Sequence, residues 1–262
     1  MGPGLRALGV LGIILLNGCA LFVSFSGYSG GSDVGDAGVD AGLDVEGDAA
    51  QPIALVQQAG SDFIVETASQ ASQTFGMANS AGNTLIVLGF WDTLGYAATV
   101  TDSVGNTYES TPVATNPGQQ TALQIFYVPR AAPGENTITI TMASGFSSYV
   151  GLTIFEYTGL AGANVLEGSA YQAAPGSTSA AMTPLLTTSY PRSLLFAGFA
   201  DDDGSGTISP GAGWTTLVTN PNFYMIAEAR IVDSTGKFSA TATLPSTDDQ
   251  WVGLIAAFAA EE

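Results

Sequence analysis

The residues Leu85-Ile86-Val87-Leu88-Gly89-Phe90-Trp91-Asp92 are echoed 109 residues later by Leu194-Leu195-Phe196-Ala197-Gly198-Phe199-Ala200-Asp201. Such continuous apolar runs are typical of central strands that are covered on both faces of a sheet. Two further pairs of blocks share an offset of 102 residues, and all three pairs keep the same order. These pairs are Thr137–Thr141 with Ser239–Thr243, and Tyr149–Leu152 with Trp251–Leu254. These matches predict a twofold internal repeat of strand-like segments, with a chance likeness between strands built from the same residue types as the alternative.

Around these blocks, short runs of Val, Ile, Thr, Phe and Tyr alternate with turns of Gly, Pro, Asn and Asp, and no long stretch has a helical period. Within Thr137–Thr141, threonines alternate with Ile138 and Ile140, which predicts one wet face and one dry face. The segment Asp102–Asn106 predicts a hairpin turn. No strand is predicted between residues 158 and 192. We predict an all-β fold for residues 51–262: a two-layer antiparallel β-sandwich, jelly-roll-like, with pseudo-repeated halves.

The N-terminus has the parts of an export signal, because Arg6 precedes the apolar run Leu8–Leu16 and small Gly18 precedes Cys19. The string ending at Cys19 resembles the lipobox of bacterial lipoproteins. That resemblance implies a signal peptide over residues 1–18 and a lipid-anchored Cys19. An uncleaved transmembrane anchor over Leu8–Phe25 and an ordinary cleaved signal remain alternatives. All three place the rest of the chain outside the cytoplasm, and the lipobox points to the outer membrane or the cell surface.

Residues 19–50 carry repeated acids among Gly and Ala. The acids are Asp33, Asp36, Asp40, Asp44, Glu46 and Asp48. This composition cannot bury enough apolar surface to fold, and it predicts a flexible, self-repelling tether. The alternative, a calcium loop, lacks the ligand spacing of an EF-hand. We therefore divide the chain into a signal (1–18), a lipidated acidic linker (19–50) and a β-sandwich domain (51–262).

Composition limits the available chemistry. The chain of 262 residues has no histidine, one cysteine and a net charge of −18. These counts argue against histidine-based catalysis, an internal disulfide and a nucleic-acid partner. Carboxylate chemistry and calcium binding remain possible.

Three segments resemble turn and strand motifs of a loosely defined family of secreted bacterial β-sandwich modules: Ala81–Val87, Val100–Tyr108 and Phe155–Leu160. The resemblance implies a role at the cell surface, in proteins that often carry adhesion or glycan-related modules. It implies no catalytic residues.

Candidate binding residues follow from residue type and position. Asp201 and Asp203, on a glycine-bearing loop after a predicted strand, form a candidate Ca²⁺ site, with a plain solvated turn as the alternative. Trp214, which follows a glycine-rich turn, is the candidate exposed ring for stacking on a sugar, together with Tyr224.

Two glutamates fall inside predicted strands. Glu156 alternates with Phe155 and Tyr157, so we expect it on the solvent face. Glu228 is expected to pair across strands with Arg192 or Arg230.

These observations support three hypotheses of function. The first is a non-enzymatic surface lipoprotein whose sandwich serves adhesion or binds a glycan or a surface protein, with Ca²⁺ as the one candidate cofactor. The second is a structural or assembly protein of an envelope or filament. The third is a carboxylate-dependent glycan hydrolase, which requires two acids facing each other across a cleft.

Overall fold

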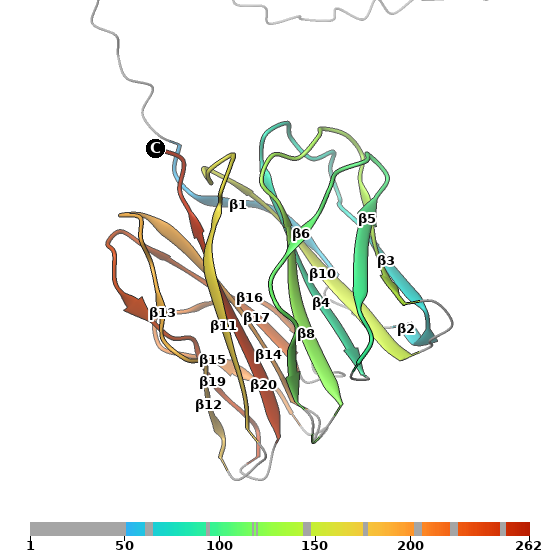
Figure 1. Ribbon diagram of the computed structural model, residues 1–262, viewed down its shortest axis with the longest axis vertical. Helices are drawn as coiled ribbons and strands as arrows, with labels where there is room; N and C mark the ends of the chain where they lie inside the picture. Colours follow the sequence, from blue (N-terminus) through green and yellow to red (C-terminus); the bar gives the residue numbers. More distant parts are fainter. Residues whose placement is uncertain are drawn as a thin grey trace, which may run out of the picture. The chain divides into compact units, whose positions relative to one another are not determined.

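The computed structural model describes residues 51–262, apart from 61–64, 93–94, 117, 119, 144–147, 175–177, 202–205, 221–224 and 247–249. Every regular element within these ranges is a β-strand, and all strand pairs are antiparallel (Figure 1). The prediction of an all-β antiparallel sandwich is confirmed. The signal segment, Cys19 and the acidic linker lie outside the described residues.

The first half of the domain consists of one large and one small sheet. Its strands are β1 (Ala54–Ala59), β2 (Val65–Ala68), β3 (Gln70–Thr74), β4 (Thr84–Asp92), β5 (Ala98–Asp102), β6 (Glu109–Ser110), β7 (Ala114–Asn116), β8 (Thr121–Val128), β9 (Thr137–Met142) and β10 (Ser148–Thr158). The large sheet has the order β1-β10-β4-β8-β6, with β2 also paired to β10 and β7 to β8. The small sheet has the order β3-β9-β5.

The second half repeats this plan. Its strands are β11 (Leu166–Ala174), β12 (Ala180–Met182), β13 (Leu186–Thr187), β14 (Ser193–Asp201), β15 (Ser209–Pro210), β16 (Thr215–Asn220), β17 (Met225–Val232), β18 (Lys237–Phe238), β19 (Thr241–Thr243) and β20 (Trp251–Ala259). The large sheet is β11-β20-β14-β17-β16 and the small sheet is β12-β19-β15, with β13-β18 as a separate pair. The predicted repeat is confirmed by this order.

The two large sheets pack face to face, and each carries its own small sheet on its other face (Figure 1). Phe155 of β10 meets Phe196 of β14 edge to face, with ring centroids 5.1 Å apart. Tyr127 of β8 meets Phe258 of β20 in the same way at 5.6 Å. The domain thus has four layers instead of the two predicted, because each half forms its own sandwich. Because both large sheets are covered on both faces, strands such as β4 and β14 are apolar throughout.

The predicted alignment of the two central strands is wrong by one residue. A Cβ on Gly89 would meet Ile140 of β9, in the first half's own small sheet. A Cβ on Gly198 would instead meet Leu88 of β4, in the opposite large sheet. Gly89 therefore faces a small sheet and Gly198 faces the opposite large sheet, so the two glycines are not equivalent. A shift of one residue exchanges the two faces of a strand, and such a shift aligns Leu88 with Phe196.

A second repeated motif supports the corrected alignment. Thr115-Asn116-Pro117 leads into β8, and Thr219-Asn220-Pro221 leads into β17. With these motifs superposed, Gln124 of β8 is equivalent to Glu228 of β17. Gln124 pairs with Gly89 on β4, and Glu228 pairs with Ala197 on β14. Gly89 is therefore equivalent to Ala197, whereas the predicted alignment matched it with Gly198.

Residues 47–262 form one compact unit that contains two hydrophobic cores. The larger core fills the first sandwich and the interface between the large sheets, and the smaller core fills the second sandwich. As predicted, Ile138 and Ile140 are buried while the threonines of β9 lie on the outer face, where Thr137 and Thr139 hydrogen-bond to the hydroxyls of Thr74 and Ser72 on β3. The fragment Gly47–Glu262 holds both cores and is a suitable unit for experiments.

The predicted hairpin at Asp102–Asn106 is a turn between sheets, since β5 and β6 belong to different sheets. Both carboxylate oxygens of Asp102 are saturated. Oδ1 accepts from the backbone N–H groups of Gly105 and Asn106, and Oδ2 accepts from Asn106, Tyr108 and Asn136 side chains. Burial acts to raise the pKa of Asp102, but these hydrogen bonds outweigh it and hold the pKa below its usual value.

Candidate functional site

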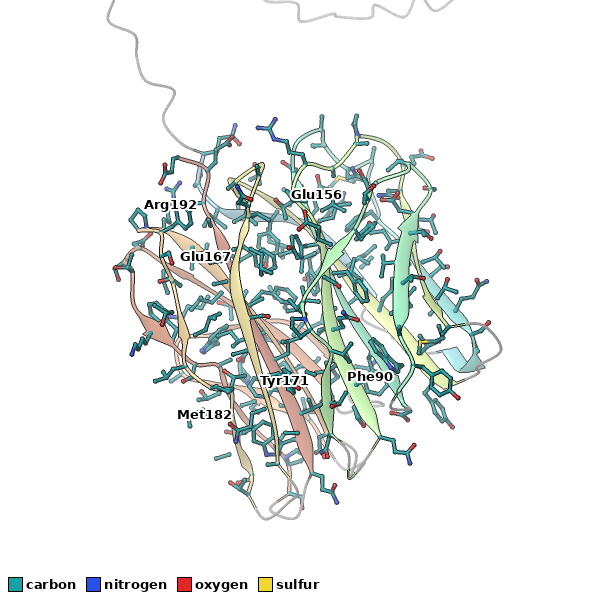
Figure 2. All side chains as sticks on the ribbon, viewed as in Figure 1. Phe90, Glu156, Glu167, Tyr171, Met182 and Arg192 are labelled. Atoms are coloured by element: carbon teal, nitrogen blue, oxygen red, sulfur yellow. The ribbon has the colours of Figure 1, made fainter. Side chains whose placement is uncertain are left out.

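Glu156 lies inside the first half, and the prediction that it faces solvent is wrong. Its side chain is 0% exposed and points from β10 toward the small sheet's side (Figure 2). The carboxylate accepts three hydrogen bonds: from Gln57 Nε2 at 2.6 Å, from the Ser80 backbone N–H at 2.8 Å and from Asn83 Nδ2 at 2.6 Å. The buried carboxylate is therefore fully supplied with donors and joins β1 and the loop before β4 to β10.

Glu228 lies inside the second half, and the predicted pair with Arg192 or Arg230 is wrong. The side chain is 0% exposed, and its Oε2 accepts one hydrogen bond of 3.3 Å from the Gly211 backbone N–H. Its Oε1 has no hydrogen-bond partner. Burial raises the pKa of Glu228 to about 8, and the bond from Gly211 offsets only part of that rise. At neutral pH the group is mainly protonated, which makes it a close analogue of the equivalent Gln124.

The two strand glutamates do not form a catalytic pair. Glu156 faces the interior of the first sandwich and Glu228 that of the second, so two large sheets lie between them. A glycosidase needs its two carboxyl groups about 5 to 9 Å apart across an open cleft. These two side chains do not meet that requirement.

A groove opens where the edges of the two large sheets meet. We call it the seam groove. Its lining residues are Leu55, Tyr157, Leu194, Gly213, Thr215, Leu217, Ala229, Arg230 and Ile231. The cavity has a volume of about 530 Å³. That volume falls in the usual range for small-molecule sites. Most of the wall is aliphatic and comes from both halves of the domain.

The seam groove is held open by a bridge between the halves. Gln58 of β1 donates from Nε2 to the backbone oxygen of Leu217 on β16 at 2.8 Å. Leu55, three residues earlier on β1, pairs with Tyr157 of β10. The groove is therefore preformed by main-chain positions and does not depend on a loop that has to close.

Tyr157 of this wall carries a buried polar group. The residue is 2% exposed, and its hydroxyl is buried without a hydrogen-bond partner. Burial raises the pKa of Tyr157 above its usual value, so the hydroxyl stays protonated. Because the hydroxyl has no surface that water can reach, other atoms of Tyr157 border the groove.

Arg230 is the only charged residue of the lining. Its guanidinium lies over the ring of Phe238, with Cζ 5.7 Å from the ring centroid, and passes near Gly213. No carboxylate within the described ranges forms an ion pair with it. Leu195, the β14 partner of Arg230, belongs to the core of the second sandwich, so the guanidinium lies on the face of β17 opposite to the groove residues Leu194 and Ala229.

The remaining predicted site residues do not gather at this groove as a binding set. Trp214 is only 8% exposed and belongs to the core of the second sandwich, so the expected exposed ring is wrong. Asp201 is buried at the end of β14. Asp203 and Tyr224 lie outside the described residues. Among the described residues, no group of three or more acidic or thiol side chains could hold a metal ion.

Sequence reasoning missed the seam groove, because its lining comes from β1, β10, β14, β16 and β17. One signal was available for Glu228: the repeated Thr-Asn-Pro triplet aligns it with a buried glutamine. No comparable signal marked Tyr157, which reads as an ordinary strand aromatic.

The chain matches no protein-family model, no curated protein sequence and no solved structure. Within the described ranges there is no helix long and apolar enough to cross a bilayer.

Proposed function

We propose that this chain is a non-enzymatic binding module, tethered outside the cytoplasm through a lipid on Cys19, that holds a small amphiphilic ligand in the seam groove. The lipid anchor and the location rest on the lipobox-like sequence before Cys19 and on the acidic linker. The binding role rests on the groove.

The observation that carries this proposal is a preformed aliphatic cavity whose wall comes from both halves of the domain. Binding sites commonly combine apolar walls with a few polar groups that fix the orientation of the ligand. The described tryptophans are all buried, so they give no support to a sugar-stacking surface.

The position of the groove fits a tethered protein. The domain begins at Gln51, whose backbone oxygen accepts from Arg192 Nη2 and whose side chain accepts from Thr158 Oγ1, each at 3.0 Å. Leu55 and Tyr157 of the groove lie close to these residues in the sequence. The C-terminus lies at the same end of the domain (Figure 1). The groove is therefore near the end that the linker joins.

The test is binding of the fluorescent amphiphile 1-anilinonaphthalene-8-sulfonate to the fragment Gly47–Glu262. We expect saturable binding at one site that Thr215→Trp abolishes, because Thr215 lines the groove from its exposed side. Thr216→Trp is the matched control, since Thr216 is an exposed threonine on the same strand and outside the lining. Equal binding by both variants, or no saturable binding by the parent, would contradict the proposal.

A second candidate function, assembly, is favoured by the edge of the second small sheet. Among the described strands, β12 pairs with β19 alone. Its residue Met182 is 55% exposed (Figure 2), and Leu185, which follows the strand, is 64% exposed. An open edge with apolar side chains can pair with a second copy of the chain. Sedimentation velocity tests this function: self-association that Met182→Lys removes would support it, and a concentration-independent monomer would refute it.

A further inference from the structure

We propose that the outer face of the first small sheet binds ice, with rows of threonine hydroxyl and methyl groups lying against the crystal surface. This inference goes beyond the proposed function, because the face belongs to β3, β9 and β5, which contribute nothing to the lining of the seam groove.

The outward side chains of these three strands form what we call the hydroxyl face, on the outer side of the first half (Figure 1). Its hydroxyl-bearing members are Ser72, Thr74, Thr99, Thr101, Thr137, Thr139 and Thr141. The strand register sets them in rows across the sheet, and Ser72, Thr139 and Thr101 form the middle row. Ile138 and Ile140 alternate with the threonines of β9 and are buried, so the hydroxyls all lie on one face.

The rows form a regular lattice. Side chains two residues apart on a strand are separated by about 6.6 Å, and neighbouring strands by about 4.8 Å. The hydroxyl oxygens of Ser72 and Thr139 are 2.8 Å apart, as are those of Thr74 and Thr137. Because threonine is stiff at χ1 and these hydrogen bonds restrict it further, the hydroxyl positions are fixed before binding. Spacings of this order separate the water oxygens on the prism faces of hexagonal ice, so the face can hold ice-like water.

The hydroxyl face is uncharged. No outward side chain of β3, β9 or β5 is acidic or basic, although the chain has 23 acidic residues. An ionised carboxylate would have to lose hydration to lie against a neutral crystal. Threonine instead offers a hydroxyl that donates and accepts, and a methyl group that restricts the orientation of adjacent water. The face has no aromatic ring on which a sugar could stack, so ice fits it better than a glycan does.

The second small sheet does not repeat this lattice, although β12, β19 and β15 have the same order as β3, β9 and β5. Across from Thr243 and Thr241 of β19, strand β12 places Ala180 and Met182. Strand β15 contains only Ser209 and Pro210. The second half therefore supplies an internal control for the first.

Partition of Gly47–Glu262 into slowly growing ice tests the inference. The protein concentration is compared between the melted ice and the remaining liquid, and the gap between melting and freezing temperatures is measured on the same samples. Growing ice excludes solutes that do not bind it, so we expect the parent to be enriched in the ice and to open a temperature gap. Thr139→Tyr should lose both effects, because the ring projects from the middle row, and tyrosine suits a strand.

Thr101→Tyr repeats the test at an exposed position of an edge strand, where a surface substitution changes stability little. Thr243→Tyr is the matched control, since Thr243 is an exposed threonine on β19, the counterpart of β9. It should keep the enrichment and the temperature gap of the parent, and circular dichroism establishes that all three variants are folded. Exclusion of the parent from ice would overturn the inference. Enrichment that survives both Thr139→Tyr and Thr101→Tyr, or that is lost in folded Thr243→Tyr, would also overturn it.

Discussion

Buried carboxyl groups have more hydrogen-bond donors in the interior of the first half than in the interior of the second half. In the first half, the carboxylate of Glu156 has three donors and that of Asp102 has five. In the second half, Glu228 has one long hydrogen bond and an oxygen without a partner. The same strand order thus supports one sandwich whose buried carboxyl groups are well supplied with donors and another whose buried carboxyl group is not.

The comparison teaches that two equally deep carboxyl groups can be supplied with donors very differently. Glu156 and Glu228 are both fully buried. Glu228 has the backbone N–H of Gly211 as its one donor, and burial raises its pKa to about 8. Four predictions test this contrast, in decreasing order of expected effect.

The largest effect is a loss of stability that originates at Glu228 as the pH rises from about 4.5 to about 8. Because its folded-state pKa is raised to about 8, the stabilisation is fully present below the unfolded value near 4.5 and is lost as pH rises through 8. Between these values the free energy of unfolding should fall by about 1.4 kcal/mol per pH unit from this group. Urea unfolding at several pH values should show that Glu228→Gln, which copies Gln124, removes this slope. An unchanged slope would mean that Glu228 is already ionised near neutral pH.

The second effect concerns Glu156, where replacement by glutamine should lower the free energy of unfolding. Glu156→Gln places an amide group against donors from Gln57, Ser80 and Asn83. We expect the free energy of unfolding at pH 7 to fall by roughly 2–3 kcal/mol. Glu135→Gln, at an exposed position, is the control and should change stability by less than about 0.5 kcal/mol. A tolerated Glu156→Gln would show that the network contributes little.

The third effect lies at Asp102. Its folded-state pKa is lowered, so its stabilisation is present above the unfolded value of 3.8 and is lost as pH falls through the folded pKa. Asp102→Asn should cost roughly 1–2 kcal/mol near neutral pH and progressively less in acid. Denaturant titrations at pH 7 and pH 2.5 measure the difference. A cost that stays constant between the two pH values would contradict the role given to the ionised carboxylate.

The smallest effect is expected at the seam. Tyr157→Phe removes a hydroxyl without a partner, so stability should stay within about 0.5 kcal/mol of the parent or rise slightly. Tyr127→Phe is the comparison, because Tyr127 donates to Glu109 Oε2 at 2.9 Å and should lose about 1 kcal/mol. Thermal unfolding of the two variants side by side distinguishes these outcomes. A marked loss in Tyr157→Phe would reveal a partner for that hydroxyl.

Much of the fold could be predicted from the sequence, because turn residues and β-branched runs mark most strands. The alternation of threonine and isoleucine gave the correct faces of β9. The register of β4 against β14 could not be read, since a strand buried on both faces has no polar side to set its phase. For the same reason, alternation with Phe155 and Tyr157 placed Glu156 wrongly on the solvent face.

Strand β11 was missed because its sequence, Leu-Glu-Gly-Ser-Ala-Tyr-Gln-Ala-Ala, lacks β-branched residues. It lies at the edge of its sheet and owes its pairing to β20 alone. The seam groove was beyond sequence reasoning on physical grounds as well. It exists only because the edges of two large sheets meet, and strand patterns carry no information on how two halves of a repeat pack.

The most direct test of the groove as the functional site is a nuclear Overhauser measurement on methyl-labelled Gly47–Glu262 with bound 1-anilinonaphthalene-8-sulfonate. We predict contacts from the aromatic protons of the dye to the methyl groups of Leu55, Leu217 and Ile231, which line the groove. Contacts to Met182 and Leu185 instead, at the exposed edge of the second small sheet, would contradict the account.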